Sequence, residues 1–593
     1  MPATHATGEA LELTDRDLLP LRPWRRAQED PQHPSFSHVV DGDWQTITAG
    51  EHLESLVATV RGLVASGVAA GDRVVLMADT RYEWLLLDEA IWNAGAGTVP
   101  VYPSSSRSQL EWIVRDSGAR VLLVETPAMA QLATGLDVEV LVIDDGALAT
   151  LAERGRTVPE EEVHARRDAV TLDGLAGIVY TSGTTGRPKG VRLPHSAWTY
   201  EAAAVDSVHI LGPDDKAFLW LPLAHVFGKV LLTLPLQVGF TTAIDGRVDK
   251  IVENLPIVKP VWMGAAPRIF EKVYGRISMM MRDEGGVKAK LFDWHSGNAS
   301  KVSDANAAGQ KIGAATALQH KVGDAIIAKK IRERFGGNIR FFISGSAALN
   351  RDVAKWFDGM GIPILEGYGL TETSAAATVN RPYALRVGTV GWPNVQTEIK
   401  VAEDGEILVR GEHVMEGYHN NPEATAEVLT EDGWFHTGDI GEVDADGFVK
   451  ITDRKKDLFK TSNGKYVAPS QIESTFKGLC PYVGQLLVHG ENRQFVTALV
   501  TLDEEAIQPW AEANGLADAS YTEIVSSMQA REMVQSYVDE LNAGLNRHEQ
   551  IKRFHILGRD LTVEDGELTP SLKLRRKVVA DKFKGDIEEM YPS

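Results

Sequence analysis

The segment Tyr180–Gly190, YTSGTTGRPKG, has the composition of a loop that binds polyphosphate. It follows the run LAGIVY, which is typical of a buried strand. Glycines let backbone amides approach an anion, hydroxyl groups donate hydrogen bonds, and a lysine supplies a positive charge suited to phosphate. The candidate binding residues are Thr181, Ser182, Gly183, Thr184, Thr185, Gly186 and Lys189. The pattern is not a Walker A loop, because that loop requires Ser or Thr after its lysine and Gly190 stands there.

A second segment, EGYGLTET at Glu366–Thr373, has residues that could bind a purine and a metal ion. Tyr368 offers a ring on which a purine can stack. Glu372 is an oxygen ligand of the kind that Mg²⁺ prefers, usually with one or two carboxylates beside phosphate and water. The candidate nucleotide-binding residues of this segment are Glu366, Gly367, Tyr368, Gly369 and Thr371. In the short run SGSA, the small residues Gly345 and Ser346 would permit backbone contacts with a base.

Farther along the chain, one carboxylate is a candidate for binding a ribose, and an arginine after it is a second candidate functional residue. Asp439 lies in WFHTGDIG, and a carboxylate can accept hydrogen bonds from two ribose hydroxyls. Arg454 lies in the charged run DRKKD. Such a run is usually a solvated surface, but its place after Asp439 and at a change in sequence character favours a functional interpretation.

These motifs, in this order, resemble those of the adenylate-forming enzymes, which include acyl-CoA synthetases, firefly-type luciferases and the adenylation domains of peptide synthetases. The resemblance runs from about Thr48 to Lys577. It implies that the chain uses ATP to activate a carboxylic acid as an acyl adenylate. It further implies that Thr181 and Glu372 hold Mg²⁺, and that Asp439 and Arg454 contact the nucleotide ribose.

The resemblance also assigns two catalytic residues near the reacting atoms. Lys573, in TPSLKLRRK, matches the lysine that bridges the substrate carboxylate and the α-phosphate, where negative charge grows during the reaction. Leu572 precedes it where the commoner motif has glycine, and the TPxxK form is similar to that of long-chain acyl-CoA synthetases. His225, in LPLAHVFG, matches a residue beside the substrate carboxylate. We expect it to orient that group rather than act as a base, because a carboxylate is already ionised at neutral pH.

The kind of acid is inferred from the lack of a carboxylate in LPLAHVFG and from the resemblance of a later helical span to one branch of the family. Amino-acid-activating members of the family that this chain resembles usually have an Asp near LPLAHVFG to pair with the substrate ammonium, and this segment contains no carboxylate. Because an unpaired buried ammonium is costly, the resemblance implies an acid without one. The span Arg268–Phe335 resembles the long-chain fatty acyl-CoA synthetase branch. Gly464, in KTSNGKYVAP, matches the hairpin that approaches coenzyme A after the small domain rotates about Lys456. The implied substrates are a fatty acid, ATP and coenzyme A.

Three alternatives compete with this interpretation. One is a fatty acyl-AMP ligase that passes its adenylate to a carrier protein, and another is a ligase of an aryl or short-chain acid. A third is a non-catalytic nucleotide-binding protein, which the presence of all the expected catalytic groups disfavours. Chain-length preference, oligomeric state and pathway do not follow from the sequence.

The elements that must position these residues alternate between helix and strand. Helical spacing in Glu51–Ser66 and Arg81–Ala94 alternates with strand-like runs at Asp72–Met77, Thr98–Val101 and Arg120–Val124. This alternation predicts layered α/β subdomains. The span between Pro267 and Pro363 lacks proline and predicts long helices, with a looser middle near Gly297–Asn306. Strands are also expected at Leu175–Tyr180, Asn338–Ser344, Gly405–Val409, Phe435–Thr437 and Phe448–Thr452.

A change in sequence character near Asp453 predicts the domain organisation. We expect an α/β adenylation domain over residues 1–452 and a mobile α+β domain over residues 453–593, joined by a hinge at 453–457. The length of 593 residues also requires more than one domain, because single cores stop growing at roughly 250–300 residues.

Composition excludes several classes of protein. A net charge of −21 argues against a general nucleic-acid binder. The single cysteine, Cys480, permits neither an internal disulfide nor a cysteine-based zinc site, which fits a cytoplasmic location. No signal peptide and no transmembrane run are expected, while peripheral membrane contact stays open.

Overall fold

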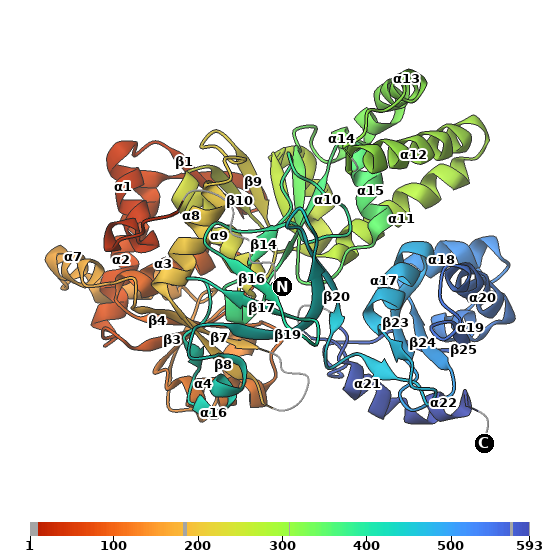
Figure 1. Ribbon diagram of the computed structural model, residues 1–593. Coiled ribbons are helices and arrows are strands. Elements are labelled where there is room, and N and C mark those ends of the chain that lie inside the picture. The colour runs from red at the N-terminus through yellow and green to blue at the C-terminus, as the bar shows by residue number, and fades with distance from the viewer. Residues whose placement is uncertain (1–9, 182–186, 308, 570–572, 592–593) are drawn as a thin grey trace.

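The computed structural model describes residues 10–181, 187–307, 309–569 and 573–591, which form a large N-terminal and a small C-terminal domain (Figure 1). In the described part of the large domain, one sheet has seven strands in the order β18-β8-β7-β4-β3-β5-β6. Its inner strands are parallel, and β8 and β18 join antiparallel at one edge. The strands are β3 (Arg73–Met77), β4 (Gly97–Val101), β5 (Val121–Val124), β6 (Glu139–Val142), β7 (Leu175–Thr181), β8 (Lys189–Pro194) and β18 (Gly417–Tyr418).

A second sheet has nine strands in its described part, in the order β15-β14-β13-β12-β11-β9-β10-β1-β2, with a parallel centre and antiparallel strands at both edges. Its strands are β1 (Pro34–Val40), β2 (Asp43–Thr48), β9 (Lys216–Leu219), β10 (Thr241–Ile244), β11 (Trp262–Ala265), β12 (Phe341–Ser344), β13 (Ile364–Tyr368), β14 (Thr378–Val379) and β15 (Trp392–Pro393). In parallel sheets, ligands bind beyond the carboxyl ends of the strands. The residues after β12 and at the end of β13 therefore lie where a ligand is expected.

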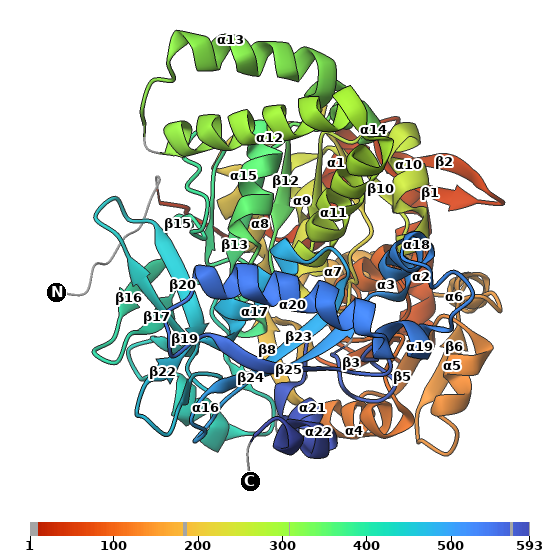
Figure 2. The ribbon, with the colours of Figure 1, turned by 90° about the vertical axis from the view of Figure 1, so that its right-hand side faces the viewer.

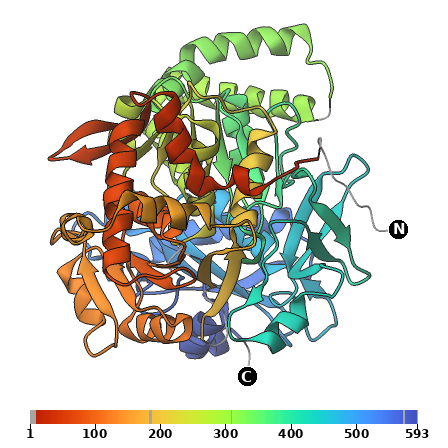
Figure 3. The ribbon, with the colours of Figure 1, turned by 90° about the vertical axis from the view of Figure 1, so that its left-hand side faces the viewer.

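Helices cover both sheets, and most of the apolar strand faces share one large core. One face of the seven-stranded sheet forms a separate core with residues 110–133. Figure 3 shows the N-terminal helices in red and orange on the side away from the C-terminal domain. In chain order, the helices that precede β11 are α1 (Arg22–Glu29), α2 (Ala49–Ala65), α3 (Tyr82–Asn93), α4 (Arg107–Ser117), α5 (Pro127–Leu132), α6 (Ala147–Gly155), α7 (Glu160–Asp168), α8 (His195–Asp206), α9 (Val226–Val238) and α10 (Ile251–Val258).

An antiparallel four-stranded sheet, β16-β17-β19-β20, leads from the large domain to the small one. Its strands are β16 (Glu398–Val401), β17 (Glu406–Arg410), β19 (Phe435–Val443) and β20 (Val449–Arg454), and α16 (Pro422–Val428) precedes β19. Because β20 continues to Arg454, this strand enters the predicted hinge.

The C-terminal domain has a core of its own, separate from that of the large domain. A short hairpin precedes a three-stranded sheet in the order β23-β24-β25, and helices pack against that sheet. The elements are β21 (Phe459–Lys460), β22 (Tyr466–Val467), α17 (Pro469–Leu479), β23 (Val483–His489), β24 (Val496–Leu502), α18 (Glu504–Ala513), α19 (Tyr521–Ser526), α20 (Met528–Ala543), β25 (Ile551–Ile556), α21 (Arg576–Lys582) and α22 (Lys584–Glu589). The α/β class and the two domains predicted from the sequence are confirmed.

The proline-free span forms helices α11 to α14, but the predicted loose middle was wrong. These helices are α11 (Pro267–Glu284), α12 (Gly286–Ala307), α13 (Ala314–Gly323) and α14 (Lys329–Arg334), and α15 (Arg351–Gly359) follows β12. Residues 297–306 belong to α12, because Ala299 and Val302 are buried and Ala299 packs closely on Gly359 of α15. Packing against α15 therefore overrides the weak helix propensity of Gly297 and its polar neighbours. Figure 2 shows α12 and α13 as two stacked layers at one end of the molecule.

The expected strands near 72–77, 98–101, 120–124 and 175–180 are all present, with ends shifted by one residue or fewer. The expected strand at Asn338–Ser344 is shorter and begins at Phe341. None of the helices in the described ranges combines the length and apolarity needed to cross a bilayer.

Candidate active site

The phosphate loop connects two antiparallel strands. Thr181 ends β7, Lys189 begins β8, and the two residues are partners in the β-ladder. The predicted residues Ser182, Gly183, Thr184, Thr185 and Gly186 lie outside the described residues. At the base of the loop, the Tyr180 hydroxyl donates a 2.6 Å hydrogen bond to Asp116 of α4. This bond ties the strand that enters the loop to the neighbouring helix.

Tyr418 of β18 connects the phosphate loop to the second motif. The Lys189 ammonium lies 4.7 Å from the centre of the Tyr418 ring, and the Tyr418 hydroxyl donates a 2.8 Å hydrogen bond to Glu372 Oε1. Sequence reasoning missed Tyr418, because it belongs to no motif quoted above. The only signal available was an aromatic residue in a glycine-containing turn. Lys189 thus lies over the face of the Tyr418 ring, and Glu372 lies at the hydroxyl of the same residue.

The proposed ribose-binding residues lie next to the end of β13. The Tyr368 hydroxyl donates a 2.7 Å hydrogen bond to Asp439 Oδ2, and Arg454 Nε lies 3.3 Å from Asp439 Oδ1. Asp439 and Arg454 face each other as ladder partners on β19 and β20. Burial raises the pKa of Asp439, while Arg454 and Tyr368 oppose that shift. The structure therefore brings together Tyr368, Asp439 and Arg454, three of the residues that the sequence had assigned to the nucleotide.

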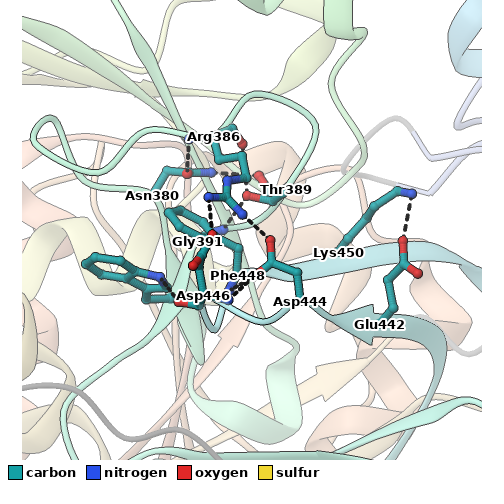
Figure 4. A network of polar contacts seen from close by, with 10 residues as sticks. Asn380, Arg386, Thr389, Gly391, Glu442, Asp444, Asp446, Phe448 and Lys450 are labelled. Carbon is teal, nitrogen blue, oxygen red and sulfur yellow. Dashed lines mark hydrogen bonds and ion pairs between the residues drawn. The ribbon is translucent and has the colours of Figure 1, made fainter. Parts of the chain in front are cut away.

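The far end of the β19–β20 hairpin is fastened to the loop between β14 and β15 (Figure 4). Arg386 forms ion pairs with Asp444 and Asp446, and its guanidinium lies 4.1 Å from the centre of the Phe448 ring. The Asn380 side chain accepts a 3.0 Å hydrogen bond from the Arg386 backbone amide. This network fixes the hairpin that carries the two ribose candidates.

Lys573, from the small domain, reaches this same region of the large domain. Desolvation and the charge of Arg454 lower the pKa of Lys573 to about 8, while Asp439 and Glu372 oppose that shift. The neighbouring cations are engaged elsewhere: Arg576 forms a bidentate pair with Glu473, and Arg575 donates to the Gly566 carbonyl. Lys573 is therefore the cation of its motif that approaches Glu372 and Asp439.

Comparison with known proteins agrees with this arrangement. The family model described as "AMP-binding enzyme" matches residues 24–419, and "AMP-binding enzyme C-terminal domain" matches residues 456–593. This chain belongs to the AMP-binding enzyme family. A similar protein is "Long-chain-fatty-acid--CoA ligase FadD15" of Mycobacterium bovis, 36% identical with 100% of this chain and 99% of that protein covered. "Long chain acyl-CoA synthetase 6, peroxisomal" of Arabidopsis thaliana is 29% identical, with 93% of this chain and 82% of that protein covered.

Among solved structures, the adenylation domain of a carboxylate reductase from Mycobacterium chelonae has a similar fold. It superposes with a TM-score of 0.73 at 21% identity, and the match covers 97% of this chain and 91% of that one. At this identity, the likeness supports the fold alone. It nevertheless places this AMP-binding enzyme among proteins that have the same large and small domains.

His225 of this AMP-binding enzyme caps the N-terminus of α9. Its Nδ1 accepts a 3.1 Å hydrogen bond from the Phe227 backbone amide. Because Nδ1 is an acceptor, the ring proton resides on Nε2. Burial, and secondly the charge of Lys573, lower the pKa of His225 to about 3, so the ring is neutral. A neutral ring with a free N–H suits a donor that orients a carboxylate.

The remaining nucleotide candidates lie around the ends of β12 and β13. Gly345 and Ser346 follow β12, and Ser346 has a left-handed backbone with φ of 74°, a strained conformation that clusters at functional sites. Thr371 and Glu372 lie in a 3₁₀ turn after β13. A Cβ on Gly369 would lie 1.5 Å from the Ala375 carbonyl oxygen, so this glycine is required by the fold of the turn itself.

Glu366 has a different environment from the other predicted residues. Its buried carboxylate accepts hydrogen bonds from the backbone amides of Leu349 and Gly388, and desolvation raises its pKa to about 7. The next residue, Gly367, packs against the Thr378 carbonyl of β14. The Glu366 side chain thus fixes the backbone near the end of β13.

Gly464 lies apart from this cluster. It has φ of 74° in the exposed turn between β21 and β22, and a Cβ there would meet nothing within 4 Å. In this arrangement of the domains, Lys573 is at the candidate site and Gly464 faces open space.

Proposed function

We propose that this AMP-binding enzyme is a long-chain fatty acid–CoA ligase, which converts ATP, a fatty acid and coenzyme A to acyl-CoA, AMP and pyrophosphate. The observation that carries the proposal is the position of Lys573, which is desolvated and lies within the electrostatic reach of Arg454, Asp439 and Glu372. That convergence suits the first half-reaction, in which a carboxylate attacks the α-phosphate. The full-length similarity to a long-chain fatty acid–CoA ligase of Mycobacterium bovis supports the class of acid and the thiol acceptor.

In the first step, a carboxylate oxygen bonds to the α-phosphorus and the bond to the pyrophosphate oxygen breaks. Lys573 neutralises the charge that grows on the phosphoryl oxygens, which is the largest single kind of catalytic effect in such sites. His225 Nε2–H orients the carboxylate. Asp439 and Arg454 fix the ribose, while Lys189 and the phosphate loop, with the neighbouring Gly345, Ser346, Gly367, Gly369 and Thr371, bind the rest of the nucleotide.

Mg²⁺ fits the oxygen donors of this site. Glu372 offers one carboxylate, of which Oε1 is bonded by Tyr418 and Oε2 stays available, and Thr181 offers a hydroxyl. One carboxylate is the number that Mg²⁺ commonly takes when phosphate and water complete its shell. Bound there, the ion would neutralise phosphate charge and orient the leaving pyrophosphate.

In the second step, the thiol sulfur of coenzyme A attacks the acyl carbon, the carbon–oxygen bond to AMP breaks and the thiol proton leaves to solvent. We propose that the small domain, with a hinge at 453–457 and rotation about Lys456, first withdraws Lys573 and brings the Gly464 turn to the site. The positive φ and open surroundings of Gly464 suit a turn that a ligand approaches closely. Such closures often limit turnover.

The test is a panel of acids from acetate to oleate, with pyrophosphate release and thioester formation followed separately. We expect pyrophosphate release to rise with chain length and acyl-CoA to form only when coenzyme A is present. If acyl-AMP accumulates unchanged after coenzyme A is added, the enzyme is an acyl-AMP ligase instead. If acetate or benzoate is preferred to oleate, the long-chain assignment is wrong.

The reaction would take place in the cytoplasm, where the free, buried Cys480 would stay reduced.

A further inference from the structure

The outer face of the helical segment 314–334 exposes a row of large apolar side chains. Leu318, Val322 and Ile326 are 66%, 44% and 46% exposed. They recur every fourth residue along α13 and the π-helical turn Asp324–Ala328, so they lie along one side of a continuous helical rod. Large apolar side chains that recur on an exposed helix face mark interaction sites more often than isolated ones do.

The opposite face of this segment is fully used in packing. Gly323, Ile327 and Ile331 are buried, and a Cβ on Gly323 would collide with the His295 ring of α12. The helical segment 314–334 therefore cannot rotate to bury Leu318, Val322 and Ile326 without losing these contacts. The exposed row, which we call the α13 stripe (Leu318, Val322 and Ile326), is a second apolar face in addition to the one that faces the core.

Positive charge surrounds the α13 stripe. The exposed residues Lys321, Lys329 and Lys330 lie between and beyond its members on the same segment. Residues 286–334 contain nine Lys or Arg against four Asp or Glu, although the whole chain has a net charge of −21. A basic, apolar segment in a strongly acidic protein indicates a partner that is both negatively charged and apolar.

We propose that the α13 stripe and its lysines dock this enzyme on an anionic phospholipid surface. Apolar side chains would enter the boundary between headgroups and acyl chains, as in interfacial amphipathic helices. Lysine stems would extend along the apolar surface with their ammonium groups among lipid phosphates, each contributing to the attraction. The inference rests on the proposed function only for its purpose, since long-chain fatty acids partition into bilayers.

The location of the stripe suits this role. Figures 1 and 2 show α13 as the outermost element at one end of the molecule, with α21 and α22 of the small domain at the other end. Helix α11, which begins the helical region, follows strand β11, and β11 pairs with β12 immediately before Gly345. Docking through α13 would therefore hold the enzyme on the membrane while leaving the small domain free to move.

The test is co-flotation of the full-length enzyme with vesicles of phosphatidylcholine, either alone or mixed with phosphatidylglycerol. Two variants are compared with the wild type: L318S/V322S/I326S removes the stripe, and K321E/K329E/K330E reverses its charge. The control is V252S/I257S, which changes two exposed apolar residues of α10 that are 66% and 62% exposed. Ligase activity with a medium-chain acid in solution, circular dichroism and light scattering are measured in parallel.

We expect the wild type and the control to float with the mixed vesicles and to lose binding as salt rises. Charge reversal should weaken partitioning by at least about a hundredfold, since each lysine near an anionic surface contributes about a factor of five and three are lost. The stripe variant should lose flotation while keeping its fold and activity in solution. Equal flotation of all proteins, absence of wild-type flotation, or a wild-type dimer that the stripe variant dissociates would each overturn the proposal. If the wild type shows no ligase activity in solution, the proposed function is refuted instead.

Discussion

The Tyr368 hydroxyl donates a 2.7 Å hydrogen bond to Asp439 and so joins the end of β13 to the β19–β20 hairpin. Asp439 is buried and Tyr368 is partly buried, and desolvation raises the pKa of each. The bond orients the carboxylate, whose other oxygen faces Arg454 at 3.3 Å. A ring assigned from the sequence to stacking on a purine therefore also fixes the carboxylate assigned to the ribose.

The variant Tyr368→Phe should raise the KM for ATP by roughly tenfold or more, because one hydrogen bond to a charged group, worth about 1.5 kcal/mol or more, is lost. The ring remains available for stacking, so binding should weaken rather than vanish. The matched control is Tyr466→Phe, which alters a tyrosine that is 61% exposed on the small domain. An unchanged KM for ATP in Tyr368→Phe would show that Asp439 does not depend on this bond.

Local patterns in the sequence were sufficient for some of the elements that carry the site, such as β7. Leu175–Tyr180 could be identified as a strand because a short apolar run before a polar loop has few other folds. The contact between Lys189 and Tyr418 could not be predicted, since it depends on β18 returning from far along the chain to pair with β8. The helix across Gly297–Asn306 was missed for a similar reason, because α15 supplies its buried face.

Some residues had the right motif and a role that only the packing reveals. Gly369 was expected to admit a nucleotide, but the Ala375 carbonyl occupies the space where its Cβ would lie. Glu366 was expected at the nucleotide, but backbone amides from two separate loops surround its carboxylate. The contacts of Glu366 come from loops that are distant in the sequence, so local spacing does not predict them.

The variant Lys573→Ala should abolish adenylate formation and leave thioester formation from supplied acyl-AMP largely intact. This outcome is expected because, in the proposed mechanism, Lys573 serves the first half-reaction and is withdrawn for the second. Pyrophosphate release measures the first step, and conversion of synthetic acyl-AMP with coenzyme A measures the second. Lys577→Ala is the control, since this exposed lysine lies four residues away in the same motif. Equal loss of both steps in Lys573→Ala would refute the assigned role.

The pH dependence of the first step should follow the pKa of Lys573, which is about 8. The cationic form is the active one, so kcat/KM for adenylation should be flat below pH 8 and fall tenfold per pH unit above it. Lys573→Arg should be slower but lack this decline, because a guanidinium stays protonated across the range. A decline of the same form in Lys573→Arg would assign the titration to another group.

Substitution of His225 should separate its capping role from its role toward the substrate. His225→Ala removes both the acceptor for the Phe227 amide and the imidazole N–H, so we expect a loss of about 1 kcal/mol of stability together with a fall in kcat/KM. His225→Asn keeps a good N-cap and should restore stability but not activity. Thermal unfolding and adenylation rates measure the two effects. Full activity in His225→Asn would show that capping is the only role of this residue.

The interface between the domains should bias the enzyme toward adenylate formation. Lys272 of α11 lies 2.8 Å from the largely buried Asp503, which caps α18 of the small domain. If the small domain rotates, this pair must separate. Lys272→Ala should therefore slow adenylation by a few-fold, as expected for a pair worth up to about 1 kcal/mol, and leave thioester formation unchanged or faster.

The matched control is Arg276→Ala, because both side chains of the Arg276–Glu505 pair are exposed and the pair should contribute little. High salt should reproduce the effect of Lys272→Ala in the wild type only weakly, since Asp503 is shielded from solvent. Equal slowing of both half-reactions in Lys272→Ala would show that the pair supports the fold rather than one arrangement of the domains.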